Sequence, residues 1–163
     1  MSVIGYSYGD TMDAELVIKA IQNARIKGKF KPGAIFHSDL GSQYTSNKVE
    51  RYLKELELKH SYSKKGYPYD NASMESFYAI LKKEEVNLHE YKTFEEAQRV
   101  IFEFIESLYN RRRIHSAINY RTPYELEQQA VWKKNEILLK NKKILKKSVQ
   151  KLDIDPKINS KEI

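Results

Sequence analysis

The sequence predicts an α/β fold in which helices cover the faces of a small sheet. Short segments rich in β-branched and aromatic residues alternate with longer segments whose apolar residues recur at helical spacing. Glycine, proline and small polar residues separate these segments, as expected of the loops between them. Strands that alternate with helices in this way are typical of a sheet flanked by helices.

Three segments are predicted to be strands because β-formers are concentrated in short runs. They are residues 2–8 (SVIGYSY), 34–38 (AIFHS) and 59–63 (KHSYS). The second strand is apolar enough to be buried, and it delivers Asp39 at its C-terminal end. Three strands make a small sheet for a fold of this class.

Four helices are predicted where apolar residues repeat every three or four positions. They span residues 13–27, 48–57, 72–85 and 93–109. Asp13 is the expected N-cap of the first helix, and Thr93 and Glu96 have capping-box spacing at the start of the fourth. Residues 110–123 are irregular and basic, and a short helix is predicted from Pro123.

The positive charge of the chain is concentrated towards its C-terminal end. The net charge of the chain is +7. Residues 131–163 hold ten lysines and four acids, whereas residues 1–130 hold 19 basic and 18 acidic residues. This pattern predicts a folded domain over residues 1–129 and a basic tail, helical or disordered, over residues 130–163. The tail is either a solvated segment or a surface that attracts nucleic acid without sequence preference.

The composition excludes several classes of protein. An apolar content of 40% with 12% aromatic residues is typical of a globular chain. The absence of cysteine excludes disulfides and thiolate zinc sites. No apolar run is long enough to cross a membrane, and residues 1–10 do not resemble a secretion signal, so we expect a cytoplasmic protein.

Two acidic residues lie where their elements would present them to a substrate. Asp39 follows the second strand in HSDLGSQY (37–44), and Glu75 lies one turn into the third helix. Lys82, seven residues after Glu75, returns to nearly the same face of that helix. Carboxylates on two elements can share divalent ions, and a nearby cation can hold a phosphate backbone. The pattern therefore indicates phosphoryl transfer on nucleic acid.

Each of these residues also has an ordinary structural interpretation. Asp39 is alternatively a turn acid at a strand end. Glu75 is alternatively a first-turn acid that the helix dipole favours. Lys82 is alternatively a solvated lysine on a helix surface.

Three sequence blocks, in this order, resemble the DDE transposase and retroviral integrase superfamily. The blocks are HSDLGSQYTS (37–46), DNASMESFYAILKKE (70–84) and YNRRRIHSAINYRTP (109–123). The chain is most similar to the catalytic region of IS3-type insertion-sequence transposases, over about residues 2–128. The resemblance includes the 35 residues that lie between Asp39 and Glu75.

The resemblance implies a ribonuclease-H-like fold and metal-dependent cleavage and strand transfer of DNA. Asp39 matches the family's second catalytic acid and Glu75 its third, so both are implied catalytic residues and metal ligands. Two Mg²⁺ ions, or Mn²⁺ in their place, are the implied cofactors, because such ions prefer carboxylate oxygens. Lys82 is an implied DNA contact.

Further residues in the three blocks are assigned supporting roles. His37, Gln43 and Asn71 are expected to form a second shell around the ligands. A metal-ligand role for His37 is the alternative. Arg113 and His115 either contact DNA or cap the long helix, and Ile114 stands where the family usually has proline.

The resemblance also implies that part of the catalytic domain is not in this chain. The family's first acid lies on a strand that would precede residue 2, so we expect an incomplete fold that lacks its first two strands. Asp10 and Asp13 are the alternatives for that acid, but they are interpreted as a turn residue and a helix cap. We therefore expect a transposase fragment that is inactive alone. Its expected partners are DNA and either further copies or intact transposase, on the bacterial nucleoid.

Two other functions follow from the same residues. The chain is alternatively a non-catalytic remnant that binds DNA or interferes with intact transposase. A ribonuclease-H-like nuclease is the third interpretation. The incomplete ribonuclease-H-like fold is expected to carry extra C-terminal helices.

Overall fold

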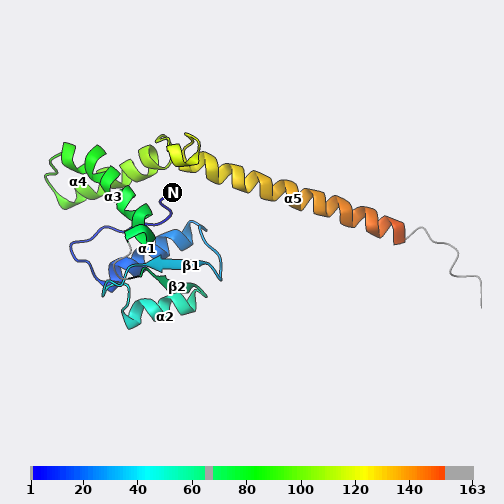
Figure 1. Ribbon diagram of the computed structural model, residues 1–163, viewed down its shortest axis with the longest axis horizontal. Helices are drawn as coiled ribbons and strands as arrows, with labels where there is room; N and C mark the ends of the chain where they lie inside the picture. Colours follow the sequence, from blue (N-terminus) through cyan, green and yellow to red (C-terminus); the bar gives the residue numbers. More distant parts are fainter. Residues whose placement is uncertain (1, 65–67, 153–163) are drawn as a thin grey trace, which may run out of the picture. The chain divides into compact units, whose positions relative to one another are not determined.

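A two-stranded parallel sheet supports the first half of the molecule. In the computed structural model, which describes residues 2–64 and 68–152, β1 (Ile35–Ser38) pairs with β2 (Lys59–Tyr62). Ile35 lies opposite Lys59, and Ser38 lies opposite Tyr62. Parallel strands need a crossover connection, which α2 (Asn47–Glu55) supplies. Figure 1 shows the two strands with α1 and α2 beside them. Both strands were predicted from the sequence, but the predicted burial of β1 is wrong, because Ile35 is 69% exposed and Ser38 is the one buried residue of the strand.

The chain divides into two compact units, one up to Arg112 and one from Arg113 onward. The first unit is an α/β structure that is mostly helical. Each unit is described here by itself.

An apolar cluster beneath the sheet joins α1 (Ala14–Ile26) to α2. It consists of Ile18, Ile21, Val49, Leu53 and Leu56, with Phe36 and Leu58 packed against it. Both helices begin at side-chain caps: the predicted cap Asp13 accepts a hydrogen bond from the Leu16 amide (2.9 Å), and Ser46 accepts one from the Val49 amide (3.3 Å). Complete burial of an aliphatic side chain contributes about 1.5–3 kcal/mol, so this cluster fixes the elements on either side of Asp39.

The predicted strand over residues 2–8 is wrong. These residues have no strand partner among the described residues. Side-chain amides take the place of a neighbouring strand. Asn110 donates to the Val3 carbonyl (2.8 Å) and accepts from the Val3 amide (2.9 Å), and Asn23 donates to the Tyr6 carbonyl (2.9 Å). Gly5 lies so close to α1 that a Cβ atom there would be 2.4 Å from the Ala20 carbonyl oxygen.

A second apolar cluster lies beneath α3 (Ala72–Glu84). It joins Phe77 and Leu81 to Phe104, Ile105 and Tyr109. The helix predicted over residues 93–109 is present, but it changes its winding. α4 (Phe94–Glu103) continues as the π-helical segment η3 (Phe104–Tyr109), and the Asn110 amide donates to the Ile105 carbonyl (3.0 Å). This wider turn directs Asn110 towards Val3.

Three short 3-10 segments complete the connections. They are η1 (Pro68–Asn71), η2 (Val86–Leu88) and η4 (Ser116–Ile118).

The described residues of the second unit form a closed loop and one long helix. His115 and Arg121 form an antiparallel β-bridge, and Asn119 and Tyr120 between them have positive φ angles of 57° and 55°. α5 (Pro123–Leu152) then runs for 30 residues, so the prediction of a short helix is wrong. Residue 129 lies within α5, and the domain division predicted there stays a prediction.

The sequence of α5 explains its length. Thr122 and Glu125 form a capping box, in which the Thr122 amide donates to Glu125 (2.8 Å) and the Glu125 amide donates to Thr122 (3.1 Å). Neither glycine nor proline interrupts residues 124–152, and lysine, leucine and glutamine favour helix there. None of the described helices combines the length and the apolar character needed to cross a bilayer.

Candidate functional site

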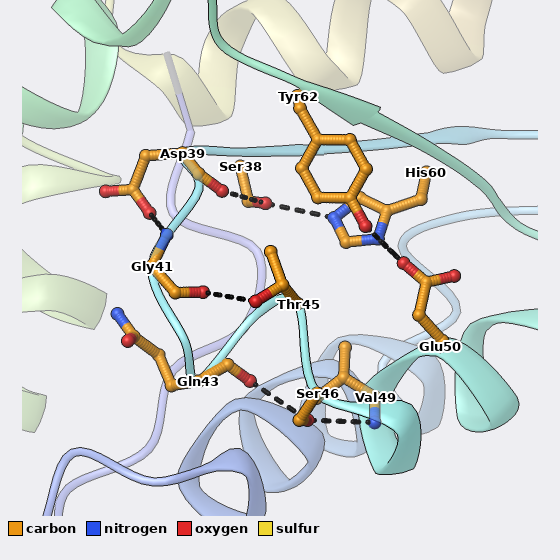
Figure 2. Close-up of polar contacts among 10 residues, drawn as sticks. All are labelled: Ser38, Asp39, Gly41, Gln43, Thr45, Ser46, Val49, Glu50, His60 and Tyr62. Carbon is orange, nitrogen blue, oxygen red and sulfur yellow. Dashed lines mark hydrogen bonds and ion pairs between the residues drawn. The ribbon is translucent and has the colours of Figure 1, made fainter. Parts of the chain in front are cut away.

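Asp39 lies in a tight turn directly after β1. Its Oδ1 accepts a hydrogen bond from the Gly41 amide (2.9 Å), and the carboxylate is exposed. The Gly41 carbonyl in turn accepts from the Tyr44 amide (3.0 Å) and from the Thr45 hydroxyl (3.3 Å). Figure 2 shows the bonds between Asp39 and Gly41 and between Gly41 and Thr45, and the bond from Ser46 to Gln43 at the start of α2. The turn therefore presents Asp39 at the C-terminal end of its strand, as predicted.

Gln43 and Asp39 converge on Gly41. A Cβ atom at Gly41 would lie 2.9 Å from the Asp39 Oδ1 and 2.7 Å from the Gln43 Nε2. A side chain at this position would fit only if the ends of the Gln43 and Asp39 side chains moved away. The structure thus brings together two of the predicted site residues.

A buried network supports the main chain of Asp39. The Ser38 hydroxyl donates to the Asp39 carbonyl (2.8 Å), and the His60 Nε2 lies 2.9 Å from the Ser38 hydroxyl oxygen. The other ring nitrogen of His60 lies 2.6 Å from Glu50 Oε1. Figure 2 shows this chain of contacts from α2 through β2 to the Asp39 turn. The sequence analysis missed all three supporting residues.

Tyr62 completes the network at its α2 end. Its hydroxyl donates to Glu50, and its ring centroid lies 4.0 Å from that of His60. The hydrogen bond to Glu50 is the main reason that the pKa of Tyr62 is raised to about 12. The hydrogen bonds from Tyr62 and then His60 lower the pKa of Glu50. His60 and Tyr62 are two positions apart in a predicted strand, so their side chains lie on the same face. That spacing is the signal that was available in the sequence.

His37 pairs with β2 across the sheet. Its Nδ1 lies 3.1 Å from the Ser61 hydroxyl, and its Nε2 lies 3.0 Å from the Ser63 hydroxyl. Both ring nitrogens are engaged, so neither is left for a metal ion in this arrangement. A supporting role for His37 towards Asp39 stays a prediction.

Glu75 lies on the exposed face of α3. Glu75, Tyr78 and Lys82 are all exposed, whereas Phe77 and Leu81 are buried on the other side of the helix. Spacings of three and seven residues place the exposed three on one face. The predicted alignment of Lys82 with Glu75 therefore agrees with the burial pattern of α3.

Asn71 occupies the N-cap position of α3. Its side chain makes no capping hydrogen bond, unlike the N-caps of α1, α2 and α4. Asn71 lies four residues before Glu75, and its proposed supporting role stays a prediction.

Tyr44 lies in the same loop as the Asp39 turn. Its amide donates to the Gly41 carbonyl (3.0 Å), and its ring centroid lies 6.4 Å from that of Phe36. Burial raises the pKa of Tyr44 most, and the charges of Tyr78 and Asp39 raise it further.

Residues 2–64 and 68–152 contain no group of three or more His, Cys, Asp or Glu residues placed to hold a metal ion. Asp39 and Glu75 have the oxygen donors that divalent ions prefer, and their role as metal ligands stays a prediction. Asp13 does not join them, because its carboxylate accepts from the Leu16 amide and the Thr11 hydroxyl (3.0 Å) as a helix cap.

Arg113 and His115 belong to the second unit. The Arg113 Nη1 donates to the Ile114 carbonyl (3.3 Å), and the His115 amide donates to the Arg121 carbonyl (3.0 Å). The structure does not place these residues with Asp39 and Glu75. Their predicted roles, contact with DNA or support of a helix, stay open.

Two family models described as an integrase core domain match the chain. One matches residues 2–68 and the other residues 56–123. The transposase for insertion sequence element IS904 of Lactococcus lactis is 41% identical over 126 residues. The chain belongs to the integrase core domain family of IS3-type transposases. This assignment confirms the resemblance inferred from the three sequence blocks.

Other relatives support the family assignment. Transposase InsF for insertion sequence IS3fB of Escherichia coli is 38% identical over 128 residues, or 78% of this chain. The match to the IS904 transposase covers 77% of this chain. The chain spans about half the length of these relatives, 50% of the Lactococcus protein and 44% of the Escherichia protein.

The integrase core also has a solved structural neighbour. The catalytic core domain of BIV integrase matches 78% of each chain with a TM-score of 0.54 at 21% sequence identity. At this identity the match shows a similar fold. The α/β class predicted from the sequence is therefore confirmed.

Proposed function

We propose that this integrase core is part of a DNA transposase that cleaves and joins DNA strands, with Asp39 and Glu75 as two of its metal ligands. The observation that carries the proposal is that Asp39, at the C-terminal end of β1, and Glu75, on the exposed face of α3, both lie in segments that match the integrase core domain. Integrase core domains typically use divalent metal ions. The relatives named above are insertion-sequence transposases.

The proposed roles follow from where each side chain lies. Asp39 and Glu75 would hold Mg²⁺ or Mn²⁺, which would activate the attacking oxygen and stabilise the leaving one when bound. Lys82 would hold a DNA phosphate beside Glu75. Gln43 would orient the Asp39 carboxylate, which it meets over Gly41. Asp39 and Glu75 by themselves are too few ligands for a complete metal site. Their proposed role is therefore limited to holding the ion.

We also propose the ribonuclease-H-like arrangement for the complete domain. The edge of β1 opposite β2 has no strand partner in the described part of the chain, and a further strand could pair there. The proposed partners are DNA and either a second copy of the chain or intact transposase. The proposed location is the bacterial cytoplasm, on the nucleoid.

Metal binding tests the roles of the two acids. We expect Asp39→Asn and Glu75→Gln each to weaken Mn²⁺ binding by the full chain at least about tenfold, because each removes a charged oxygen ligand. Isothermal titration calorimetry measures the affinity. Asp10→Asn, which removes an exposed acid from a turn, is the matched control and should bind Mn²⁺ as the wild type does. Equal affinities in all four proteins would contradict the assignment.

A non-catalytic DNA-binding role is the second candidate function. The incomplete ligand set among the described acids favours it. Joining of element ends to target DNA by the full chain with Mg²⁺ or Mn²⁺ would support the catalytic function. Binding of the same DNA without joining would support the second function.

Salt dependence tests the proposed DNA contact. Lys82→Ala should weaken DNA binding and reduce the slope of log K against log salt by about 1, as loss of one phosphate contact does. Lys83→Ala removes the same charge from a different face of α3 and should leave the slope unchanged. Fluorescence anisotropy at several salt concentrations measures both. Equal slopes for the two variants would exclude Lys82 as a specific phosphate contact.

A further inference from the structure

We infer that His60 is a positioning residue for Asp39, and that it acts through the hydroxyl of Ser38. This inference rests on the proposed role of Asp39 as a metal ligand. It assigns a function to a buried histidine that neither the family resemblance nor the metal site uses.

The contacts form one continuous path through three elements. Glu50 of α2 meets the His60 Nδ1 at 2.6 Å, and the His60 Nε2 meets the Ser38 hydroxyl at 2.9 Å. Ser38 then meets the Asp39 carbonyl at 2.8 Å. The Ser38 residue and the His60 side chain are each only 6% exposed. Water has little access to Ser38 and the His60 ring at the centre of the path, although Glu50 at one end is 31% exposed, so the protein groups decide which hydrogen bonds form at the centre.

A count of protons shows what the path requires. A serine hydroxyl has one proton to donate, and Ser38 donates it to the Asp39 carbonyl. His60 must therefore donate to Ser38 from Nε2. A carboxylate accepts only, so His60 must also donate to Glu50 from Nδ1. The three hydrogen bonds coexist only when His60 is the doubly protonated imidazolium.

Loss of a proton from His60 removes the hydrogen bond between Ser38 and the Asp39 carbonyl. A neutral imidazole has one N–H, and the Glu50 carboxylate holds it on Nδ1. The Ser38 proton then turns towards the His60 Nε2, and the Asp39 carbonyl loses its donor. The carbonyl belongs to the same turn that the Asp39 carboxylate closes with the Gly41 amide. His60 thereby sets how firmly the turn holds the carboxylate.

The groups that surround His60 come from three elements. Glu50 faces it from α2, and Tyr62 faces it from β2 with its hydroxyl bound to the same carboxylate. Lys54 lies near Glu50. From β1 the groups that face His60 are the Ser38 hydroxyl and the Phe36 ring, whose centroid is 5.2 Å from that of His60, and neither is charged.

His37 provides a contrast within the same sheet. Its two ring nitrogens meet the hydroxyls of Ser61 and Ser63, which can each donate or accept. His37 therefore satisfies its partners in either protonation state. The chain offers Ser61→Ala as a matched control for Ser38→Ala, because both changes remove a hydroxyl that meets a histidine in this sheet.

NMR of the full chain tests the inference directly. The Gly41 amide reports on the Asp39 turn, and the His60 ring carbon reports its own protonation. Over about pH 5–8, where histidine changes charge, the Gly41 shift should follow the His60 titration. Ser38→Ala should abolish the Gly41 response while His60 still titrates, and Ser61→Ala should retain it. A His37→Gln background removes the other nearby imidazole.

A conservative change at His60 separates positioning from simple packing. The amide of His60→Gln donates at every pH, so Gly41 should keep its low-pH shift throughout the range. His60→Ala should lose that shift throughout. A Gly41 amide that ignores His60 titration in the wild type would overturn the inference, as would a response that persists in Ser38→Ala.

Mn²⁺ affinity distinguishes the failure of this inference from failure of the proposed function. Ser38→Ala should weaken Mn²⁺ binding by about tenfold, as removal of an outer-shell partner does, and Ser61→Ala should not. If the wild type fails to bind Mn²⁺, the proposed metal site is wrong, and the NMR response still decides the role of His60. If Mn²⁺ binds equally to wild type and Ser38→Ala, only the inference about His60 fails.

Discussion

The two candidate ligands of this integrase core are held in different ways. Asp39 extends from a turn whose carbonyl and carboxylate both make hydrogen bonds. Glu75 extends from a helix whose N-cap residue, Asn71, makes no side-chain capping bond. The comparison indicates that hydrogen bonds fix the main chain at Asp39 before any metal binds. Glu75 lies in the first turn of α3, which has less local support.

The apolar cluster beneath Asp39 is also more deeply buried than the cluster beneath Glu75. Val49 and Leu53 beneath the Asp39 half are 0% and 1% exposed. Phe77 and Leu81 beneath the Glu75 half are 5% and 9% exposed. We therefore expect the Asp39 half to tolerate the loss of side-chain volume less well.

The largest expected difference comes from matched truncations in the two clusters. Leu53→Ala should lower the free energy of unfolding by about 3–5 kcal/mol, and Leu81→Ala by about 2–3 kcal/mol, because a more deeply buried leucine leaves a larger cavity. Urea denaturation followed by circular dichroism measures both. An equal or greater loss of unfolding free energy in Leu81→Ala would contradict the expectation that the Asp39 half is the more sensitive one.

A smaller difference is expected at the two helix starts. Ser46→Ala removes the capping bond of α2 and should lower stability by about 1 kcal/mol. Asn71→Ala removes no capping bond and should change stability by less than about 0.5 kcal/mol. Amide hydrogen exchange in the first turns of α2 and α3 would show the same order. A loss at Asn71 as great as that at Ser46 would show that α3 is supported from its N-cap after all.

The smallest expected effect concerns pH. The hydrogen bonds from Tyr62 and His60 hold the pKa of Glu50 below its ordinary value. A carboxylate with a lowered pKa in the folded state stabilises the fold above its unfolded pKa, and this contribution is lost as the pH falls through the folded pKa. Glu50→Gln should therefore reduce stability near pH 7 and have little effect in acid.

The size of this effect is limited by solvent. The Glu50 side chain is 31% exposed, so we expect less than about 1 kcal/mol at pH 7. Urea denaturation at several pH values measures it. Glu55→Gln, on the exposed side of the same helix, is the control. A loss of stability that is independent of pH would assign the role of Glu50 to packing.

Local signals predicted the parts of the fold that depend on neighbours in sequence. The caps at Asp13 and Thr93 were found because their partners lie three residues away. β1 was found because its apolar run is continuous, and Asp39 was placed correctly at its end. Glu75 and Lys82 share a helix, so their spacing alone predicted a common face.

The features that the sequence analysis missed depend on distant residues. Residues 2–8 have the composition of a strand, but their backbone partners are side chains at Asn23 and Asn110. The path from Glu50 through His60 to Ser38 joins three elements that no spacing rule relates. The π-helical turn at η3 keeps the apolar periodicity close to that of an ordinary helix, so its different winding was not visible.

The two hydrogen bonds between the Asn110 side chain and the Val3 backbone join residues that are 107 positions apart. The ribosome releases the N-terminal end first, at about 5–20 residues per second. Asn110 is therefore synthesised on the order of 5–20 seconds after Val3, and the hydrogen bonds between them cannot form before then. Until then the hydrogen bond from Asn23 to the Tyr6 carbonyl is the contact available to hold residues 2–8 against α1.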